Sequence, residues 1–180
     1  MTLGDRVVVM HQGVVQQCAS ALEIYHQPAN RYVAGFLGSP PMSFFTGKLV
    51  ERAGSLCFDE GSGQLTIADW AAPELRPLWG KEVVMGVRPE SMADQGHARF
   101  KANGSTLPMR VTLVQQLGSR MDVHLATTRH AKVVAQLDAS LGMKAGDTLD
   151  VCFDMNRVHF FEPGEIGPKL AHNPQFGLAS

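Results

Sequence analysis

The 180-residue chain lacks both long apolar runs and a large excess of charge. A membrane-spanning helix needs about 18 apolar residues, whereas the longest apolar candidates, Val7–Met10 and Val83–Met85, have the length of buried strands. Sixteen basic and seventeen acidic residues give a net charge of -1, so no global field attracts nucleic acid or an anionic bilayer. We therefore expect no nucleic-acid partner and membrane attachment only through another protein.

Cysteine is also scarce. Cys18, Cys57 and Cys152 are odd in number, widely spaced and set in apolar surroundings, and no signal peptide precedes them. This usage favours a reduced, cytoplasmic setting. We interpret all three as buried thiols that act as small hydrophobes, with a reactive thiol as the alternative.

The sequence motifs of common enzymes are missing too. A phosphate-binding loop requires G-x-x-x-x-G-K-[ST], but the Gly-Lys pairs at 47–48 and 80–81 are followed by Leu49 and Glu82. The patterns G-x-S-x-G, H-E-x-x-H and C-x-x-C do not occur. We expect no catalytic residue, no cofactor site and no metal site on this chain.

One weak metal constellation stands against that expectation. Asp122 and His124 share a strand face by alternation, and His130 and His159 would have to join them from other strands. A solvated strand face is the simpler interpretation.

The first part of the chain predicts a hairpin followed by two short helices. The runs 6–11 and 14–18 are β-like and flank a turn at Gly13, where glycine supplies a positive φ. Ser20 and Glu23 then form a capping box, which predicts a helix to about residue 26.

A second helix is predicted to begin at Asn30 and to end at Gly38. Its expected apolar face is formed by Val33, Phe36 and Leu37. A lone hairpin and two short helices cannot bury such faces by themselves. Residues 1–38 therefore resemble the end of a larger domain, followed by a linker at 39–43.

From residue 44 onward the pattern changes to short strands separated by turns. The nine expected strands are 44–52, 56–58, 64–68, 81–87, 109–114, 120–125, 132–137, 148–153 and 157–161. Several alternate between apolar and polar residues, which indicates one face in a core and one in water. The fold class is therefore mainly β, a small barrel or sandwich, with an exposed loop at 93–104.

Gly86-Val-Arg-Pro-Glu90 is a distinctive segment at the end of an apolar strand. Pro89 ends the strand because it fixes φ and has no N–H to donate. Arg88 and Glu90 can then form an ion pair or cap a turn.

A second distinctive segment, 115–119, joins two alternating strands. Gly118 predicts a bend or bulge there. Its polar neighbours Gln115, Gln116 and Ser119 could contact a ligand or another subunit, although a well-made turn explains them equally simply.

These segments resemble the ATP-binding subunits of the carbohydrate and glycerol-phosphate branch of ABC importers, the maltose-importer type. The matching stretches are 1–17, 22–25, 28–31, 33–40 with Met42, 86–90, 114–118, 146–147 and 158–161. The resemblance implies an OB-type, transport-associated β-barrel at 44–163, a remnant of the nucleotide-binding domain at 1–38 and a tail at 164–180.

The resemblance also places the family's Walker A and B motifs, signature motif, catalytic glutamate and switch histidine upstream of the position of Met1. We therefore expect a piece of a longer subunit, either cut from it or encoded as a natural fragment, that does not hydrolyse ATP. ATP and magnesium belong to the complete subunit.

The function implied by the resemblance is regulation and dimerisation. Expected partners are a second copy, the transmembrane permease, and a regulatory protein or small-molecule effector, at the inner face of the plasma membrane. The candidate interface or effector residues are Arg88, Glu90, Gln115, Gln116, Gly118 and Ser119.

Two alternatives remain open. In one, the barrel is a small-ligand module for an oxyanion or a sugar, with Arg88, Arg110 or Arg120 at an anion site. In the other, it binds single-stranded nucleic acid, but two Trp, two Tyr and the absence of a basic cluster disfavour this.

Overall fold

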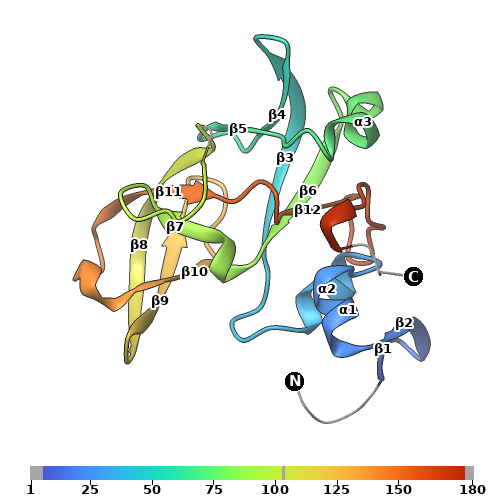
Figure 1. The fold of residues 1–180 in the computed structure, drawn as a ribbon, viewed down its shortest axis with the longest axis horizontal. Coiled ribbons are helices and arrows are strands. Elements are labelled where there is room, and N and C mark those ends of the chain that lie inside the picture. Colours follow the sequence, from blue (N-terminus) through green and yellow to red (C-terminus); the bar gives the residue numbers. More distant parts are fainter. Residues whose placement is uncertain (1–5, 103, 177–180) are drawn as a thin grey trace.

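The computed structural model describes residues 6–102 and 104–176. Within these ranges, two five-stranded antiparallel sheets enclose one core, and a hairpin with two short helices lies beside them (Figure 1). The mainly β class predicted from the sequence is confirmed. Within the described ranges, every helix is too short or too polar to cross a membrane.

The N-terminal hairpin forms where the sequence predicts it. Strands β1 (Val7–His11) and β2 (Val14–Ala19) pair around a two-residue turn, in which Gln12 and Gly13 have φ values of 47° and 80°. Positive φ at both positions matches the twist of the strands.

The prediction that all three thiols are buried is wrong for Cys18, which is exposed on β2. Strand β2 pairs only with β1, so this small sheet leaves the Cys18 side chain uncovered.

Both helices are capped as expected. In α1 (Ala21–His26) the Ser20 hydroxyl accepts a hydrogen bond from the Glu23 amide at 3.1 Å, and in α2 (Arg31–Phe36) the Asn30 side chain accepts one from the Val33 amide at 2.9 Å. These bonds satisfy amides that have no partner inside the helix.

The expected apolar face of α2 is wrong at one position. Val33 is buried and Leu37 packs with it, but the Phe36 side chain is 56% exposed. Val33 and Ala34 together define the inward direction of this helix. At 100° per residue, Leu37 stays close to that direction, whereas Phe36 points well away from it.

The first large sheet has the strand order β12-β6-β3-β4-β5. Its strands are β3 (Ser43–Arg52), β4 (Ser55–Asp59), β5 (Gln64–Thr66), β6 (Glu82–Val87) and β12 (His159–Phe161). A short helix, α3 (Ala72–Leu75), and a 3-10 turn, η1 (Arg76–Leu78), connect β5 to β6 and were not predicted.

The second large sheet has the order β10-β9-β8-β11-β7. Its strands are β7 (Met92–Asp94), β8 (Thr106–Leu117), β9 (Arg120–Ala126), β10 (Val133–Asp138) and β11 (Thr148–Phe153). All nine predicted strands therefore occur. Strand β7 was missed in the expected loop because three residues are too few for alternation to show; pairing with β11 defines it.

Three further 3-10 turns complete the described elements: η2 (Pro89–Ser91), η3 (Ala139–Leu141) and η4 (Pro174–Phe176). The core lies between the inner faces of the two sheets, where Phe45 packs against Phe153 with ring centroids 5.6 Å apart. Strands β7 and β10, the two edges of the second sheet, lie side by side without pairing. We call this unpaired junction the seam.

The C-terminal segment returns to the N-terminal helices, as Figure 1 shows by the proximity of red and blue ribbon. The Arg31 amide donates to the Gly167 carbonyl at 2.9 Å, and the Lys169 amide donates to the Ala29 carbonyl at 3.1 Å. These bonds hold the helices against the end of β12, so the first and last parts of the chain stabilise each other.

Gly47 in β3 is the point where the first sheet tolerates no side chain. A Cβ there would lie 2.4 Å from the Asp59 carbonyl oxygen and 2.5 Å from Phe58 Cζ on the paired strand. We expect Gly47→Ala to lower the free energy of unfolding by about 1–3 kcal/mol, because a paired backbone cannot move aside cheaply. Urea denaturation checks this, with the exposed neighbour change Lys48→Ala as control. Equal stability of both variants would contradict the close packing.

Candidate functional site

Arg88 joins the barrel to the N-terminal helices. Arg88 directly follows the last residue of β6, and it is only 3% exposed. The guanidinium donates to the Leu37 carbonyl and, at 2.8 Å, to the Tyr25 carbonyl, and its carbon lies 3.8 Å from the centre of the Tyr25 ring. The last carbonyls of a helix have no partner inside it, so a buried cation satisfies the ends of α1 and α2 together.

Glu90 contacts the same tyrosine at its hydroxyl group. Tyr25 donates its hydroxyl hydrogen to Glu90 Oε1. Burial, followed by this bond, raises the pKa of Tyr25 to about 12. Arg88 and Glu90 were expected to form an ion pair or to cap a turn. Among the described residues they do neither, because Arg88 binds the helix ends and Glu90 binds Tyr25, and η2 has no side-chain cap. Tyr25 itself was missed by the sequence analysis.

The segment 115–119 forms the exposed end of the β8–β9 hairpin. Gly118 has a φ of 79° and, with Ser119, makes the predicted turn between the paired residues Leu117 and Arg120. The register shift of the hairpin lies earlier in β8, between Val111 and Leu113. Gly118 therefore makes a turn and no bulge.

The two glutamines of this hairpin point to opposite faces, as strand alternation requires. Both are exposed. Gln115 Oε1 lies 3.3 Å from His124 Nε2 on the outer face, whereas Gln116 lies opposite Met121 on the core side. They therefore cannot act as one contact.

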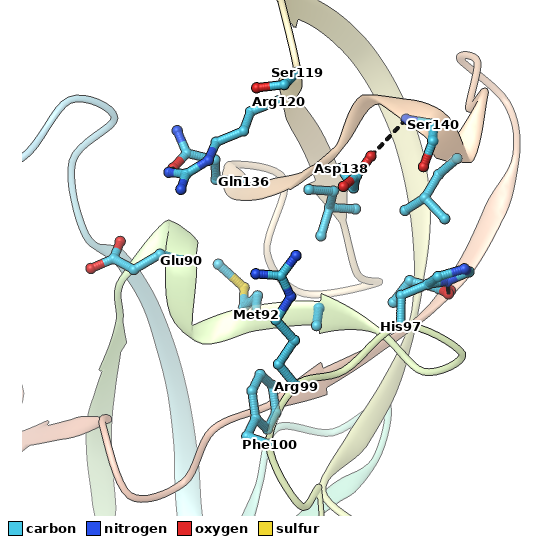
Figure 2. Close-up of a pocket in the computed structure, with 14 residues that line it drawn as sticks. Glu90, Met92, His97, Arg99, Phe100, Ser119, Arg120, Gln136, Asp138 and Ser140 are labelled. Carbon is cyan, nitrogen blue, oxygen red and sulfur yellow. Dashed lines mark hydrogen bonds and ion pairs between the residues drawn. The ribbon is translucent and has the colours of Figure 1, made fainter.

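The seam holds a pocket of about 490 Å³, which we call the seam pocket (Figure 2). It is lined by η2 and β7, by the loop after β7, by the β8–β9 turn, and by the end of β10 with η3. Among the six candidate residues, Glu90 and Ser119 line it. Tertiary folding thus brings together one residue from each distinctive segment of the sequence.

The carboxylates of the seam pocket already have partners. Asp138 accepts a hydrogen bond from the Ser140 amide at 2.9 Å, and this bond, assisted by nearby positive charge, lowers the pKa of Asp138. Asp94 lies 2.7 Å from His97 Nδ1. Together with the Tyr25–Glu90 bond, these contacts give every carboxylate that lines the pocket at least one partner.

The guanidinium groups are less committed. Arg120 donates at 3.1 Å to Gln136 Oε1. Arg99 extends into the pocket in Figure 2 and has no hydrogen bond or ion pair to any residue in 6–102 or 104–176. Among the arginines expected at an anion site, Arg120 lines the pocket, whereas Arg88 lies at the helices and Arg110 lies on β8 outside it. Arg99 was missed because its segment carries no periodic signal.

The histidines of the weak metal constellation are separated. Asp122 accepts from Gln136 at 3.2 Å, His124 contacts Gln115, and His130 and His159 lie on other parts of the fold. In the part of the chain that the structure describes, no group of three His, Cys, Asp or Glu side chains is placed to hold a metal ion.

Glu60 is the centre of a buried polar cluster that sequence reasoning missed. This fully buried carboxylate lies in the β4–β5 loop and accepts from Thr127 Oγ1 at 2.6 Å and from His130 Nδ1 at 2.5 Å, both beyond β9. His130 Nε2 accepts from the Thr46 amide at 2.9 Å, so the proton is on Nδ1. These hydrogen bonds connect the two sheets. The cluster could not be predicted because Glu60 and its partners Thr127 and His130 lie more than sixty residues apart in the sequence.

Comparisons with known proteins cover most of the barrel. A family model described as the MalK OB fold domain matches residues 38–92, and one described as the TOBE domain matches residues 85–161. A molybdate-bound crystal structure of the cytoplasmic molybdate-binding protein ModG has a TM-score of 0.52 and 23% identity, covering 67% of this chain and 96% of its own. That likeness supports the fold alone.

Several full-length relatives match nearly the whole chain. The oligosaccharides import ATP-binding protein MsmX of Bacillus subtilis is 35% identical over 90% of this chain and 44% of its own length. The trehalose/maltose import ATP-binding protein MalK of Thermococcus litoralis is 37% identical, over 90% and 43%. The sn-glycerol-3-phosphate import ATP-binding protein UgpC of Bordetella avium is 34% identical, over 91% and 43%.

The chain thus spans less than half the length of these relatives. The OB-type barrel predicted from the sequence is confirmed by the two family models. With an OB fold domain and a TOBE domain in tandem and these relatives along its length, the chain belongs to the family of carbohydrate ABC importer ATP-binding proteins, of which it carries the regulatory OB/TOBE part.

Proposed function

We propose that this chain regulates and dimerises the ATP-binding subunit of a bacterial carbohydrate importer. The observation that carries the proposal is the tandem of OB fold and TOBE domains within relatives that import sugars and glycerol phosphate. The chain contributes no ATP hydrolysis of its own; ATP and magnesium act in the remainder of the subunit.

The N-terminal unit transmits movement between that remainder and the barrel. We assign residues 1–38 to the nucleotide-binding domain, 39–43 to a linker, 44–163 to the regulatory domain and 164–180 to a tail. In support, Arg88 and the segment after β12 both bond to α1, α2 or their ends. In the complete subunit this joint works beside the permease, on the cytoplasmic side of the membrane.

The end of the β8–β9 hairpin is the proposed contact between two copies. Leu113 and Leu117 are 47% and 58% exposed on the same face as Gln115. Apolar side chains at the exposed end of a hairpin favour burial against a second copy of the same surface. Gln115 then offers polar contacts at its edge.

Dimerisation is tested by light scattering on the chain at tens of micromolar. We expect the mass of a dimer, and a shift to monomer in the double variant Leu113→Ser, Leu117→Ser, because the buried apolar contact is lost. Trp79→Ser, which changes a 64% exposed side chain in the turn between η1 and β6, serves as the matched control. A strict monomer in the unchanged chain would contradict independent dimerisation.

A second candidate function is the binding of a small oxyanion or sugar. The observation that favours it is the seam pocket, whose size falls within the usual range for small-molecule sites, roughly 300–1,000 Å³. In this version the ligand acts as an effector of the importer. Calorimetric titration with oxyanions and sugars that gives no heat would remove this candidate.

A further inference from the structure

The seam pocket contains three carboxylates that already have hydrogen-bond partners and two guanidinium groups with unused donors. Its three carboxylates are each bonded to a neighbouring group: Glu90 to Tyr25, Asp94 to His97 and Asp138 to the Ser140 amide. The donors are largely free. A guanidinium has five N–H groups, and Arg120 directs one nitrogen to Gln136 while Arg99 has no partner among the described residues.

We propose that the seam pocket binds a small molecule bearing an oxyanion group, a phosphate or a carboxylate, and that Arg99 and Arg120 hold this group. The inference rests on the proposed regulatory function and names the chemistry of its effector. Guanidinium groups suit this task because they present paired N–H donors at the spacing of two anionic oxygens.

The two arginines reach the pocket from opposite sides of the seam. Arg120 follows the β8–β9 turn, and Arg99 comes from the loop after β7. Figure 2 shows both guanidinium groups directed into the space between these segments. An anion between them would connect the loop after β7 to the start of β9, beside the unpaired edges of the second sheet.

The volume and the walls indicate a ligand larger than an inorganic ion. The pocket measures about 490 Å³ and has apolar side chains beside the arginines. These are Met92, Phe100, Leu137 and Leu141. Hydroxyl groups of Ser119 and Ser140 lie at the same site. A phosphorylated or carboxylated metabolite with a hydroxylated body fits this lining better than a bare ion.

Substitution of Asp138 tests whether the ligand is negatively charged. Its carboxylate lines the pocket, and the charge of Arg99 helps to lower its pKa, so it is negative at neutral pH and repels an incoming anion. Asp138→Asn removes that charge while keeping an oxygen for the Ser140 amide. An anionic ligand must bind this variant more tightly, and an uncharged or cationic ligand must not.

The experiment is calorimetric titration of the 180-residue chain at low ionic strength, with glucose 6-phosphate, inorganic phosphate, molybdate and glucose as probes. We expect saturable binding of the phosphorylated sugar, weaker binding of the inorganic ions and none of glucose. Arg99→Gln and Arg120→Gln should each raise the Kd about tenfold or more, since each removes charge-assisted bonds. Arg52→Gln, at an exposed position on β3, is the matched control and should leave the Kd unchanged.

Thermal unfolding of each variant distinguishes loss of the site from loss of the fold. The inference is overturned if no anionic probe binds at millimolar concentration, if glucose binds as well as its phosphate, or if Arg99→Gln and Arg120→Gln bind like the unchanged chain. Light scattering on the same samples keeps the two proposals apart. A dimer that binds none of the probes contradicts the pocket and leaves the dimerisation proposal intact.

Discussion

Replacing Arg88 with alanine is expected to lower the free energy of unfolding by about 2–4 kcal/mol. The change leaves the partly buried carbonyls of Tyr25 and Leu37 without their donor and removes the cation from the face of the Tyr25 ring. Both effects fall on the helix ends of the N-terminal unit. Urea denaturation measures the overall change, and hydrogen exchange shows where it acts.

Hydrogen exchange should speed up most in α1 and α2 and least in the two large sheets. Arg88→Lys is the informative companion, because lysine keeps the charge but cannot reach two carbonyls with one planar group; we expect an intermediate loss. Arg52→Ala, at an exposed position, controls for removal of an arginine. Uniformly faster exchange across the barrel would show that Arg88 stabilises the core instead of the joint.

Replacing Glu60 with alanine is expected to lower the free energy of unfolding by about 2–4 kcal/mol at neutral pH. The variant leaves the side-chain donors of Ser62, Thr127 and His130 facing an empty acceptor site. These donors bridge the first sheet and the loop after β9, so the loss weakens the contact between sheets. Urea denaturation of Glu60→Ala measures this loss of stability. The variant Asp59→Ala, at the partly exposed neighbouring position, serves as the control.

The same cluster predicts a pH dependence. Burial alone would raise the pKa of Glu60, but hydrogen bonds from Ser62, Thr127 and His130 outweigh it and lower the pKa below the ordinary value of 4.5. A depressed carboxyl pKa contributes stability that is fully present above the unfolded value and is lost as the pH falls through the folded value. The stability difference between the unchanged chain and Glu60→Gln should therefore be constant near neutrality and shrink below about pH 4.5. A difference that grows on acidification would contradict the assignment.

Much of the local structure followed from short-range patterns. The N-cap at Ser20, the turn at Gly13 and the strands β9 and β11 each depend on neighbours within a few residues, and the structure has all of them. The expected alternation of burial fails at Asp122 and Cys152, which are buried although they lie on the second faces of β9 and β11. The failures were equally local in origin. Phe36 was placed on the buried face because a six-residue helix does not define that face from its sequence, and β7 was too short to alternate.

The contacts that matter for function depended on the tertiary fold. Arg88 and Glu90 stood out in the sequence, but not their shared partner Tyr25, which is more than sixty residues away. Likewise, no pattern linked Glu60 to His130. Side-chain hydrogen bonds between distant segments leave no periodic trace, because their geometry is fixed only when two sheets pack.

By itself the sequence determined the class of the fold, the order of its strands along the chain and the family to which it belongs, since these depend on alternation, turn residues and recurring segments. Only the tertiary structure decided what the distinctive residues do. It placed Arg88 in a buried joint and left the β8–β9 turn exposed. It also joined Glu90 and Ser119 to Arg99 and Arg120 around one pocket, because the two edges of the second sheet approach each other without pairing.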